Sequence, residues 1–273
     1  AKHMKTKMRL LAILAVFAGF GISAQAQATA GLYDLVVGFK QTGATNNVTI
    51  DLGNVANYTA PGTYTIGNYA SILASNFTNW NTATGASALN WGAAATWSDP
   101  AGNVDTKQWA TKLWGTAAGT LGMANTTGYA AISNTSMNTG DLNINKVYTG
   151  LGTYTVGAAE ALAASNTGSW STALTAGSAF GVYTAAQFNN QASRLASGAT
   201  FSASDLYSIG NLGDQSSPTT SHFIGTFALY QDGTLTFTVV PEPSTYAAIL
   251  GVMTLGVVMI RRRRNSAELA DVA

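Results

Sequence analysis

The chain of 273 residues contains no cysteine. Disulfides, thiolate metal ligands and a lipid-modified N-terminal cysteine are therefore all excluded for it. Histidine is almost as scarce, because the only histidines are His3 and His222. With His222 alone in the body of the chain, sites with several histidine ligands are excluded, and at most one histidine is left for a Ser-His-Asp arrangement.

Charged residues make up only 9% of the chain, and they are unevenly placed. Residues 27–243 contain five basic and ten acidic residues, which gives this part a net charge of −5 although the whole chain stands at +1. Five scattered bases cannot form the cationic surface that nucleic acid requires. The composition therefore indicates no nucleic-acid partner.

Near the N-terminus a basic segment, an apolar stretch and two small residues follow one another: Lys5, Lys7 and Arg9, then Leu10–Ile22, then Ala24 and Ala26. This order is typical of a secretory signal peptide. We expect residues 4–26 to be that peptide, recognised by the general secretion machinery and cleaved by signal peptidase after Ala26 or Ala28. Residues 1–3 are interpreted as an upstream extension.

Three further features follow one another at the C-terminal end: Pro241, Glu242, Pro243 and Ser244, then an almost uncharged run at 245–260, then Arg261, Arg262, Arg263 and Arg264. The apolar run from residue 246 to 260 would make about 22 Å of helix, which is short of the roughly 30 Å hydrocarbon core of a bilayer. Snorkelling arginines and local thinning of the bilayer can cover that deficit. The arginines favour the cytoplasmic side, so we expect a transmembrane span at 245–260, a cytoplasmic tail at 265–273 and the bulk of the chain outside the cytoplasm.

The three-part arrangement resembles the PEP-CTERM sorting signal. The resemblance implies an exosortase-type processing enzyme as partner, transient anchoring in the inner membrane, processing near Pro-Glu-Pro, and delivery to the cell surface or extracellular matrix of a bacterium that makes exopolysaccharide. It covers roughly the last thirty residues. Because such tails are attached to unrelated cargo, it implies little about residues 27–240. A plain single-pass membrane protein is the alternative.

Residues 27–240 are rich in Thr, Asn, Ser, Gly and Ala, carry frequent aromatic residues, and contain no linker or charge run that would divide them. Alternation of β-prone runs with turn residues predicts a mainly β fold, an antiparallel sandwich-like domain with a few short helices; α+β is the alternative. The clearest expected strands are Tyr33–Lys40, Asn47–Leu52, Phe223–Tyr230 and Thr234–Val240.

The last two strands form an expected hairpin whose register depends on its turn. A two-residue Asp-Gly loop would place Phe227 opposite Thr238. A three-residue loop with Gly233 as a left-handed bulge instead places Phe227 opposite Phe237. We prefer the second register, because it gathers the apolar side chains of both strands on one face.

Helices are expected at three places. Asn68 can cap a short helix with Tyr69, Leu73 and Phe77 on one side. The run Ala158–Ser165 has a similar pattern. A third helix is expected after Thr184.

Two segments, 51–83 and 141–173, align without a gap at a constant offset of 90, with fifteen of 33 positions identical. Trp80 and Trp170 occupy equivalent positions in this alignment. We interpret the alignment as an internal duplication, which predicts a pseudo-symmetric sandwich or two similar halves around one core. Chance similarity within a biased composition is the alternative.

Catalytic motifs are scarce in the chain. It has no Gly-x-Ser-x-Gly nucleophile elbow. Asp141–Asn145 begins like a calcium loop, but Lys146 and Gly152 occupy the positions of the required Gly and Glu, so we interpret this stretch as a strand. A glycosidase would need two carboxylates, and nothing selects a pair among candidates such as Asp99, Asp105, Asp205 and Asp214. No catalytic residue, metal ligand or cofactor is therefore predicted.

The chain contains six tryptophans. The duplication indicates structural roles for Trp80 and Trp170. Trp97 and Trp109 flank a polar Ser-Asp-Pro-Ala-Gly-Asn loop, so they are our candidates for stacking on sugar rings.

We therefore expect a non-enzymatic, exported protein of the cell surface or matrix that has a structural or adhesive role in association with extracellular polysaccharide. A carbohydrate-binding module is the first alternative. A secreted glycan-active hydrolase is the second.

Overall fold

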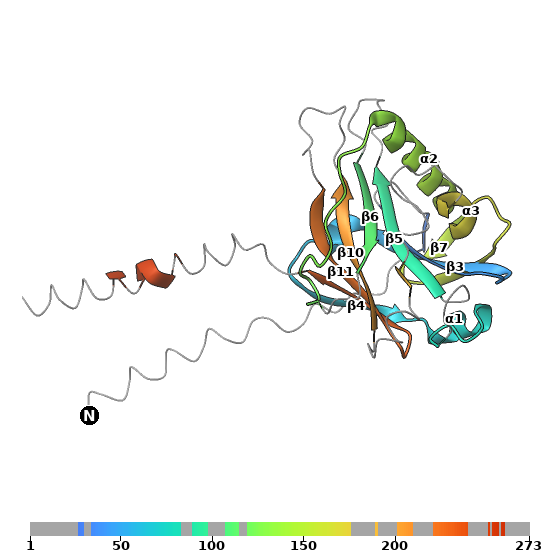
Figure 1. The fold of residues 1–273 in the computed structure, drawn as a ribbon, viewed down its shortest axis with the longest axis horizontal. Helices are drawn as coiled ribbons and strands as arrows, with labels where there is room; N and C mark the ends of the chain where they lie inside the picture. Colours follow the sequence, from blue (N-terminus) through green and yellow to red (C-terminus); the bar gives the residue numbers. More distant parts are fainter. Residues whose placement is uncertain are drawn as a thin grey trace, which may run out of the picture.

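The computed structural model describes residues 27–29, 34–82, 89–97, 107–114, 119–175, 189–190, 201–209 and 221–239, together with residues 251, 253–256 and 258–259. The described body is mainly β with few helices (Figure 1), as the composition and the spacing of β-prone runs predict.

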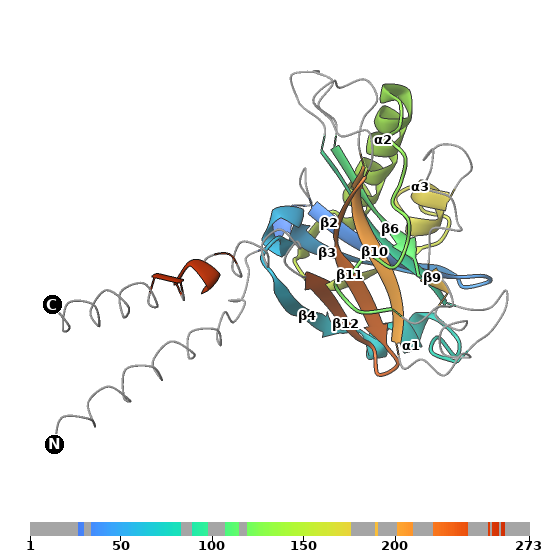
Figure 2. The same ribbon diagram turned by 60° about the vertical axis from the view of Figure 1, so that its left-hand side comes forward.

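Nine strands form one antiparallel sheet that curls over (Figure 1 and Figure 2). In spatial order they are β4 (Gly62–Asn68), β12 (Thr234–Val239), β11 (His222–Tyr230), β10 (Phe201–Ile209), β6 (Lys107–Leu113), β5 (Leu89–Trp97), β2 (Asp34–Gln41), β3 (Asn46–Asn54) and β8 (Ala159–Ala163). The short β9 (Asn189–Asn190) pairs with β5, and β1 (Gln27–Thr29) pairs with β7 (Thr153–Thr155) in a separate two-stranded sheet. A short 3-10 helix, η1 (Val55–Tyr58), follows β3.

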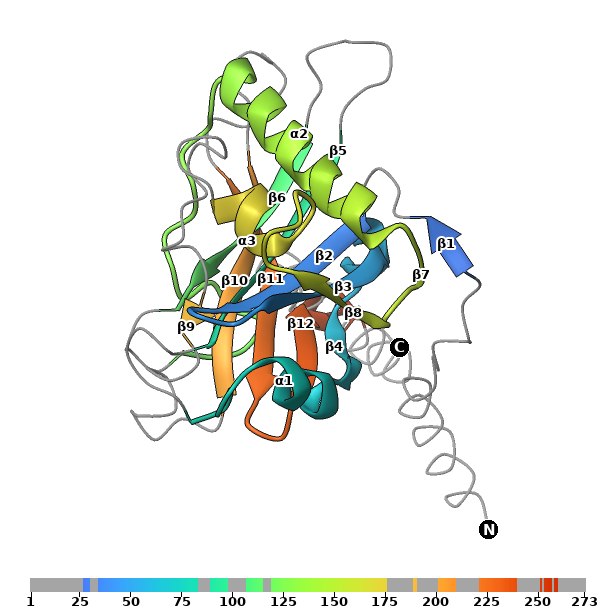
Figure 3. The same cartoon turned by 90° about the vertical axis from the view of Figure 1, so that its right-hand side faces the viewer.

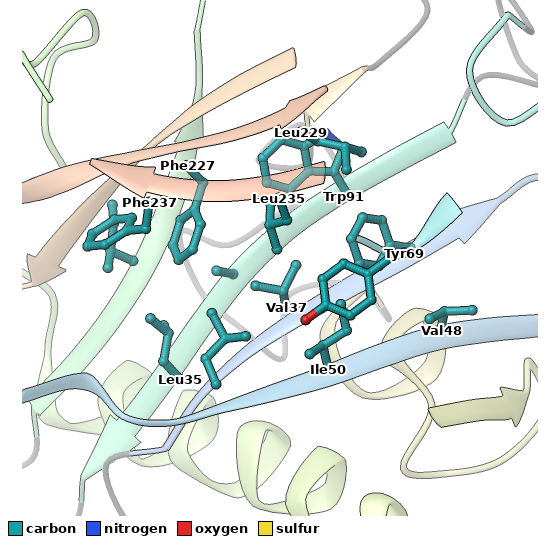
Figure 4. Close-up of a cluster of buried hydrophobic side chains, with 14 of the residues drawn as sticks. Leu35, Val37, Val48, Ile50, Tyr69, Trp91, Phe227, Leu229, Leu235 and Phe237 are labelled. Carbon is teal, nitrogen blue, oxygen red and sulfur yellow. The ribbon is translucent and has the colours of Figure 1, made fainter. Parts of the chain in front are cut away.

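The larger apolar cluster lies inside the curl. Leu35 and Val37 of β2 and Ile50 of β3 face Leu235 and Phe237 of β12 across this core, as Figure 4 shows, and all five side chains are completely buried. Successive side chains of a strand point to opposite faces, so the period-two spacing in β2 places Leu35 and Val37 on the same face. Burial of each such side chain stabilises the fold by about 1.5–3 kcal/mol.

The opposite face of the central strands is covered by α2 (Asn134–Leu151) and α3 (Trp170–Thr175), as Figure 3 shows. Helix α2 begins after Ser133, whose Oγ accepts a hydrogen bond from the Ser136 amide at 3.3 Å. It ends at Gly152, which has a φ of 64°. The residues of α2 buried against the sheet recur at helical spacing: Met137, Gly140, Ile144, Val147, Tyr148 and Leu151.

One contact between α3 and the sheet requires a glycine. The Trp170 ring lies directly on Gly38 of β2, where an added Cβ would stand 1.8 Å from Trp170 Cδ2. Trp170 is completely buried there. The absence of a side chain at Gly38 is therefore what allows the indole to lie on the sheet.

The strands predicted at both ends of the body are confirmed. Tyr33–Lys40 and Asn47–Leu52 correspond to β2 and β3, which pair with each other. The hairpin of β11 and β12 has the preferred register, with Phe227 opposite Phe237, and Gly233 has the predicted positive φ, at 86°.

The helix predicted after Asn68 is also confirmed, as α1 (Ala70–Asn76). The Asn68 side-chain oxygen accepts a hydrogen bond from the Ala70 amide at 3.1 Å. Tyr69, Leu73 and Phe77 lie buried in the inner cluster, as their helical spacing predicts.

The strand predicted at Asp141–Asn145 is wrong, because these residues form the middle of α2. Alternation over five residues indicated a strand, but the apolar spacing from Met137 to Leu151 is that of a helix. Leu142 accordingly points outward and is 63% exposed.

One further predicted helix is wrong, and another lies mostly outside the described residues. Residues 159–163 within Ala158–Ser165 form β8, which pairs with residues 46–50 of β3. Gly157, with a φ of 84°, and the edge of β3 outweigh the helix propensity of the alanines. Of the helix predicted after Thr184, the structure describes only Asn189 and Asn190, which pair with β5.

The two aligned segments do not fold alike. Residues 51–54 end β3, whereas 141–144 lie in α2, and α1 in the first segment corresponds to β8 in the second. Trp80 lies in a turn after α1, and its side chain belongs to the inner cluster. Trp170, by contrast, begins α3 on the other face of the sheet. The expectation of two similar halves is therefore wrong.

Candidate functional site

The residues predicted to direct sorting and processing lie outside the described residues. They are Ala24 and Ala26 at the N-terminus, Pro241, Glu242, Pro243 and Ser244 after the last strand, and Arg261, Arg262, Arg263 and Arg264. The last described residue before the motif is Val239, which ends β12. Strand β12 thus ends two residues before the predicted processing motif begins.

Part of the predicted transmembrane span is described. Residues 251, 253–256 and 258–259 are helical, and their large apolar side chains are exposed: Met253 63%, Leu255 59%, Val258 45% and Met259 62%. Within the portion of the chain that the structure describes, no helix has both the length and the apolar character to cross a bilayer.

The two candidate sugar-stacking tryptophans have different surroundings. Trp109 is only 9% exposed and belongs to the inner cluster, so little of its ring is open to a ligand. In the register of β5 with β6, Trp109 lies opposite Ala95 on the core side of the sheet. Trp97 is half-buried, and Lys107 Nζ lies 5.8 Å from its ring centroid. Residues 98–106 between the two strands are outside the described residues.

The other four tryptophans are buried in the fold. Trp80 and Trp91 belong to the inner cluster, and Trp170 lies against Gly38. The Trp91 indole Nε1 donates to Ser202 Oγ at 3.1 Å, and Trp114 Nε1 donates to Asp205 Oδ1 at 2.5 Å. Structural roles for Trp80 and Trp170 are therefore confirmed, although their places are not equivalent.

Asp205 of β10 accepts five hydrogen bonds from groups of this chain. Its side chain is completely buried. Oδ1 accepts from Trp114 Nε1 and, at 3.0 Å, from Thr226 Oγ1. Oδ2 accepts from the amides of Asn125 and Thr126 at 2.7 and 3.0 Å, and from Thr126 Oγ1 at 3.1 Å.

Three of these five hydrogen bonds, those from Asn125 and Thr126, attach the segment 119–128 to β10 of the sheet. The other two connect Asp205 to Trp114 and to Thr226 of β11. Thr226 Oγ1 also accepts from the Gly122 amide at 3.1 Å, and Tyr207 Oη hydrogen-bonds to the Thr126 carbonyl. A buried carboxylate is stable only when such donors replace its hydration. Asp205 is therefore a structural anchor, and its two oxygens are already engaged by groups of this chain.

The open side of the curl, between β4 and β8, is bridged by a tyrosine. Tyr69 Oη donates to the Gly157 carbonyl at 3.0 Å, which connects the start of α1 to the segment before β8. Burial raises the pKa of Tyr69 to about 12, so the phenol stays neutral and keeps this donor well above physiological pH.

An open groove of about 430 Å³ lies between α2 and the segment before α3. It is lined by Leu142, Lys146, Thr149 and Gly168 among others. Lys146 Nζ donates to Asn143 Oδ1 at 2.9 Å. The groove thus offers one cation and an exposed leucine, which is a contact surface and not an arrangement for acid–base chemistry.

Comparison of the chain with protein-family models, with curated proteins and with solved structures found no match. The class of the protein can therefore be described only by its fold, which is a mainly β body built on one curled antiparallel sheet. Strand β12 of this sheet ends two residues before the C-terminal motif.

Proposed function

We propose that the chain is an exported protein of the bacterial cell surface or extracellular matrix, delivered by its C-terminal signal. One observation carries the proposal: the order of Pro241–Pro243, an apolar run and four arginines, which begins two residues after β12 ends. A processing enzyme acting there would release the body without cutting into the sheet. An exosortase-type enzyme is the proposed partner.

The described residues of the apolar run support transient anchoring in the inner membrane. They are helical, and Met253, Leu255 and Met259 are each more than half exposed. Exposed apolar side chains gain free energy when they are transferred out of water, at about 25 cal/mol per Å² of buried surface. We propose that this run forms the span at 245–260 and that residues 4–26 are removed as a signal peptide.

For the body we propose a structural or adhesive role in association with extracellular polysaccharide, with the curled sheet acting as a sandwich-like module. The anchoring of Asp205 supports this role over catalysis, since one of the candidate carboxylates has both oxygens engaged within the fold.

Carbohydrate binding is the second candidate function, and the half-buried ring of Trp97 favours it. Saturable binding of the host polysaccharide that Trp97→Ala abolishes would support this candidate. Binding that is unchanged in the variant would leave the structural role.

The sorting proposal predicts the fate of a variant in the host. Replacing Pro241, Glu242 and Pro243 together by alanine is expected to stop processing, because the enzyme loses the rigid motif beside the membrane. The chain should then accumulate in the membrane fraction at its full C-terminal length, as mass spectrometry of that fraction would show.

A matched control places three alanine substitutions beyond the arginines, at Asn265, Ser266 and Glu268. This control should be processed and released as the unaltered chain is. Equal release of both triple variants would contradict the proposal.

A further inference from the structure

Strand β4 is the last strand at one end of the curled sheet (Figure 2) and borders the open side of the curl. Within the described residues, β4 pairs with β12 alone. Gly62, Thr63 and Thr65 are exposed. An exposed edge carries backbone donors and acceptors that can pair with a further strand.

Most exposed edge strands carry a feature that prevents such pairing, such as a charge, a proline or a bulge. Strand β4 has neither a charged residue nor a proline. Pro61 directly precedes the strand, and a register shift against β12 occurs at Ile66, so Gly62–Thr65 remains as regular strand between these two features. At the other end of the sheet, by contrast, β8 carries the exposed Glu160.

The charge distribution of the chain restricts where a second copy can dock on it. The part of the chain from residue 27 to 243 has a net charge of −5, so two copies repel each other over most of their surface. The exception is the end of the sheet formed by β4, β12 and β11, because these three strands contain no Asp, Glu, Lys or Arg. The acid Asp232 lies in the β11–β12 turn, beside Asn68 at the far end of β4 from Gly62. Two copies can meet edge to edge there without bringing like charges together.

We propose that β4 pairs with β4 of a second copy, antiparallel about a two-fold axis perpendicular to the sheet. Such an axis keeps the outer face of one copy continuous with the outer face of the other. Thr63 then lies opposite Thr65 of the second copy, and Tyr64 lies opposite the second Tyr64 on the core side. The outer-face hydroxyl row, in which Thr63 Oγ1 and Thr238 Oγ1 are 3.2 Å apart, continues across the contact.

The contact involves about five residues from each copy, so its area falls below the roughly 1,200 Å² of stable complexes and the pairing is weak in dilute solution. Copies that are confined to a surface have a high effective concentration, so a large fraction of them can pair through a contact that is weak in solution. This homophilic contact does not depend on the sorting signal, so it can be tested separately.

The absence of native cysteine makes cross-linking a direct test. Full-length Thr63→Cys and Thr65→Cys variants would be expressed together in the host, and a disulfide catalyst would be added to the cells. The two variants together should give several-fold more disulfide-linked dimer than either variant alone. In the proposed register, Thr63 of one copy lies two positions away from Thr63 of the other, and the same holds for Thr65. Two identical cysteines would therefore be farther apart than the roughly 7 Å between Cα atoms that a disulfide can span. Asn138→Cys, on the exposed side of α2, is the matched control. The proposal would be overturned if no cross-linked dimer formed while the variants reached the surface in normal amounts. It would also be overturned if Asn138→Cys gave as much dimer as the Thr63→Cys and Thr65→Cys pair.

A charge substitution gives an independent measurement. In sedimentation of the purified full chain, Thr65→Lys should weaken self-association by roughly tenfold or more, because two lysines are brought together at the edge. Asn138→Lys adds the same charge on α2 and should leave the self-association unchanged. If both lysine variants weaken it equally, net charge governs the association and the edge contact is refuted. The free energy of unfolding of Thr65→Lys is measured in parallel. A value close to that of the unaltered chain shows that the substitution acts on association and not on folding.

Discussion

Replacement of Asp205 by alanine is expected to lower the free energy of unfolding by about 3–5 kcal/mol. The substitution leaves the Trp114 indole N–H and the amides of Asn125 and Thr126 buried without their acceptor. It also frees the segment 119–128 from the sheet, which should make that segment sensitive to proteases. Equilibrium unfolding in guanidinium, followed by tryptophan fluorescence, measures the loss.

Asp205→Asn should be intermediate in this experiment. The amide keeps the shape of the carboxylate and one acceptor oxygen, but it turns an NH₂ group toward neighbouring donors. Asp232→Ala is a suitable control, because Asp232 is exposed in the β11–β12 turn, where Oδ1 accepts from the Thr234 amide at 2.9 Å. A loss for Asp205→Ala no greater than that for Asp232→Ala would contradict the anchoring role.

Gly38→Ala is expected to destabilise the fold by about 2–3 kcal/mol, a large effect for one methyl group. The new Cβ would overlap the Trp170 ring, so the indole must leave its position or β2 must bend. Trp170→Ala alone should cost about 3–5 kcal/mol through the lost burial and the cavity.

The two substitutions should not be additive. In the double variant the alanine methyl occupies space that the indole has vacated, so its unfolding free energy should be close to that of Trp170→Ala alone. A double-mutant cycle from chemical unfolding measures this coupling. Additive losses would show that Gly38 and Trp170 do not meet as the structure places them.

Elements defined by short-range chemistry could be predicted from the sequence. The β11–β12 hairpin follows from the Gln-Asp-Gly turn and from alternating apolar residues, and α1 follows from Asn68 and the spacing of Tyr69, Leu73 and Phe77. Alternation over the five residues Asp141–Asn145 favours a strand in place of helix α2, because it leaves out the longer apolar stripe on either side. The full stripe from Met137 to Leu151 identifies the helix.

Elements defined by long-range contacts could not be predicted. Strand β8 exists because the edge of β3 is available, and β4 lies beside β12 although the two are at opposite ends of the body. The anchoring role of Asp205 had one sequence signal, an acid inside the β-prone run 201–209, but nothing in the sequence indicates its donors on the segment 119–128. The burial of Trp109 likewise depends on which face of β6 meets the core.

The central claim is that the body is exported and separated from its C-terminal signal. The most direct test is the intact mass of the protein from the native host's surface fraction, with both termini sequenced. We predict a product that begins near Gln27 and ends near Pro243, without Arg261–Arg264. A surface protein that still carries those arginines would be permanently anchored in the membrane. That result would contradict both the sorting proposal and the matrix role that depends on it.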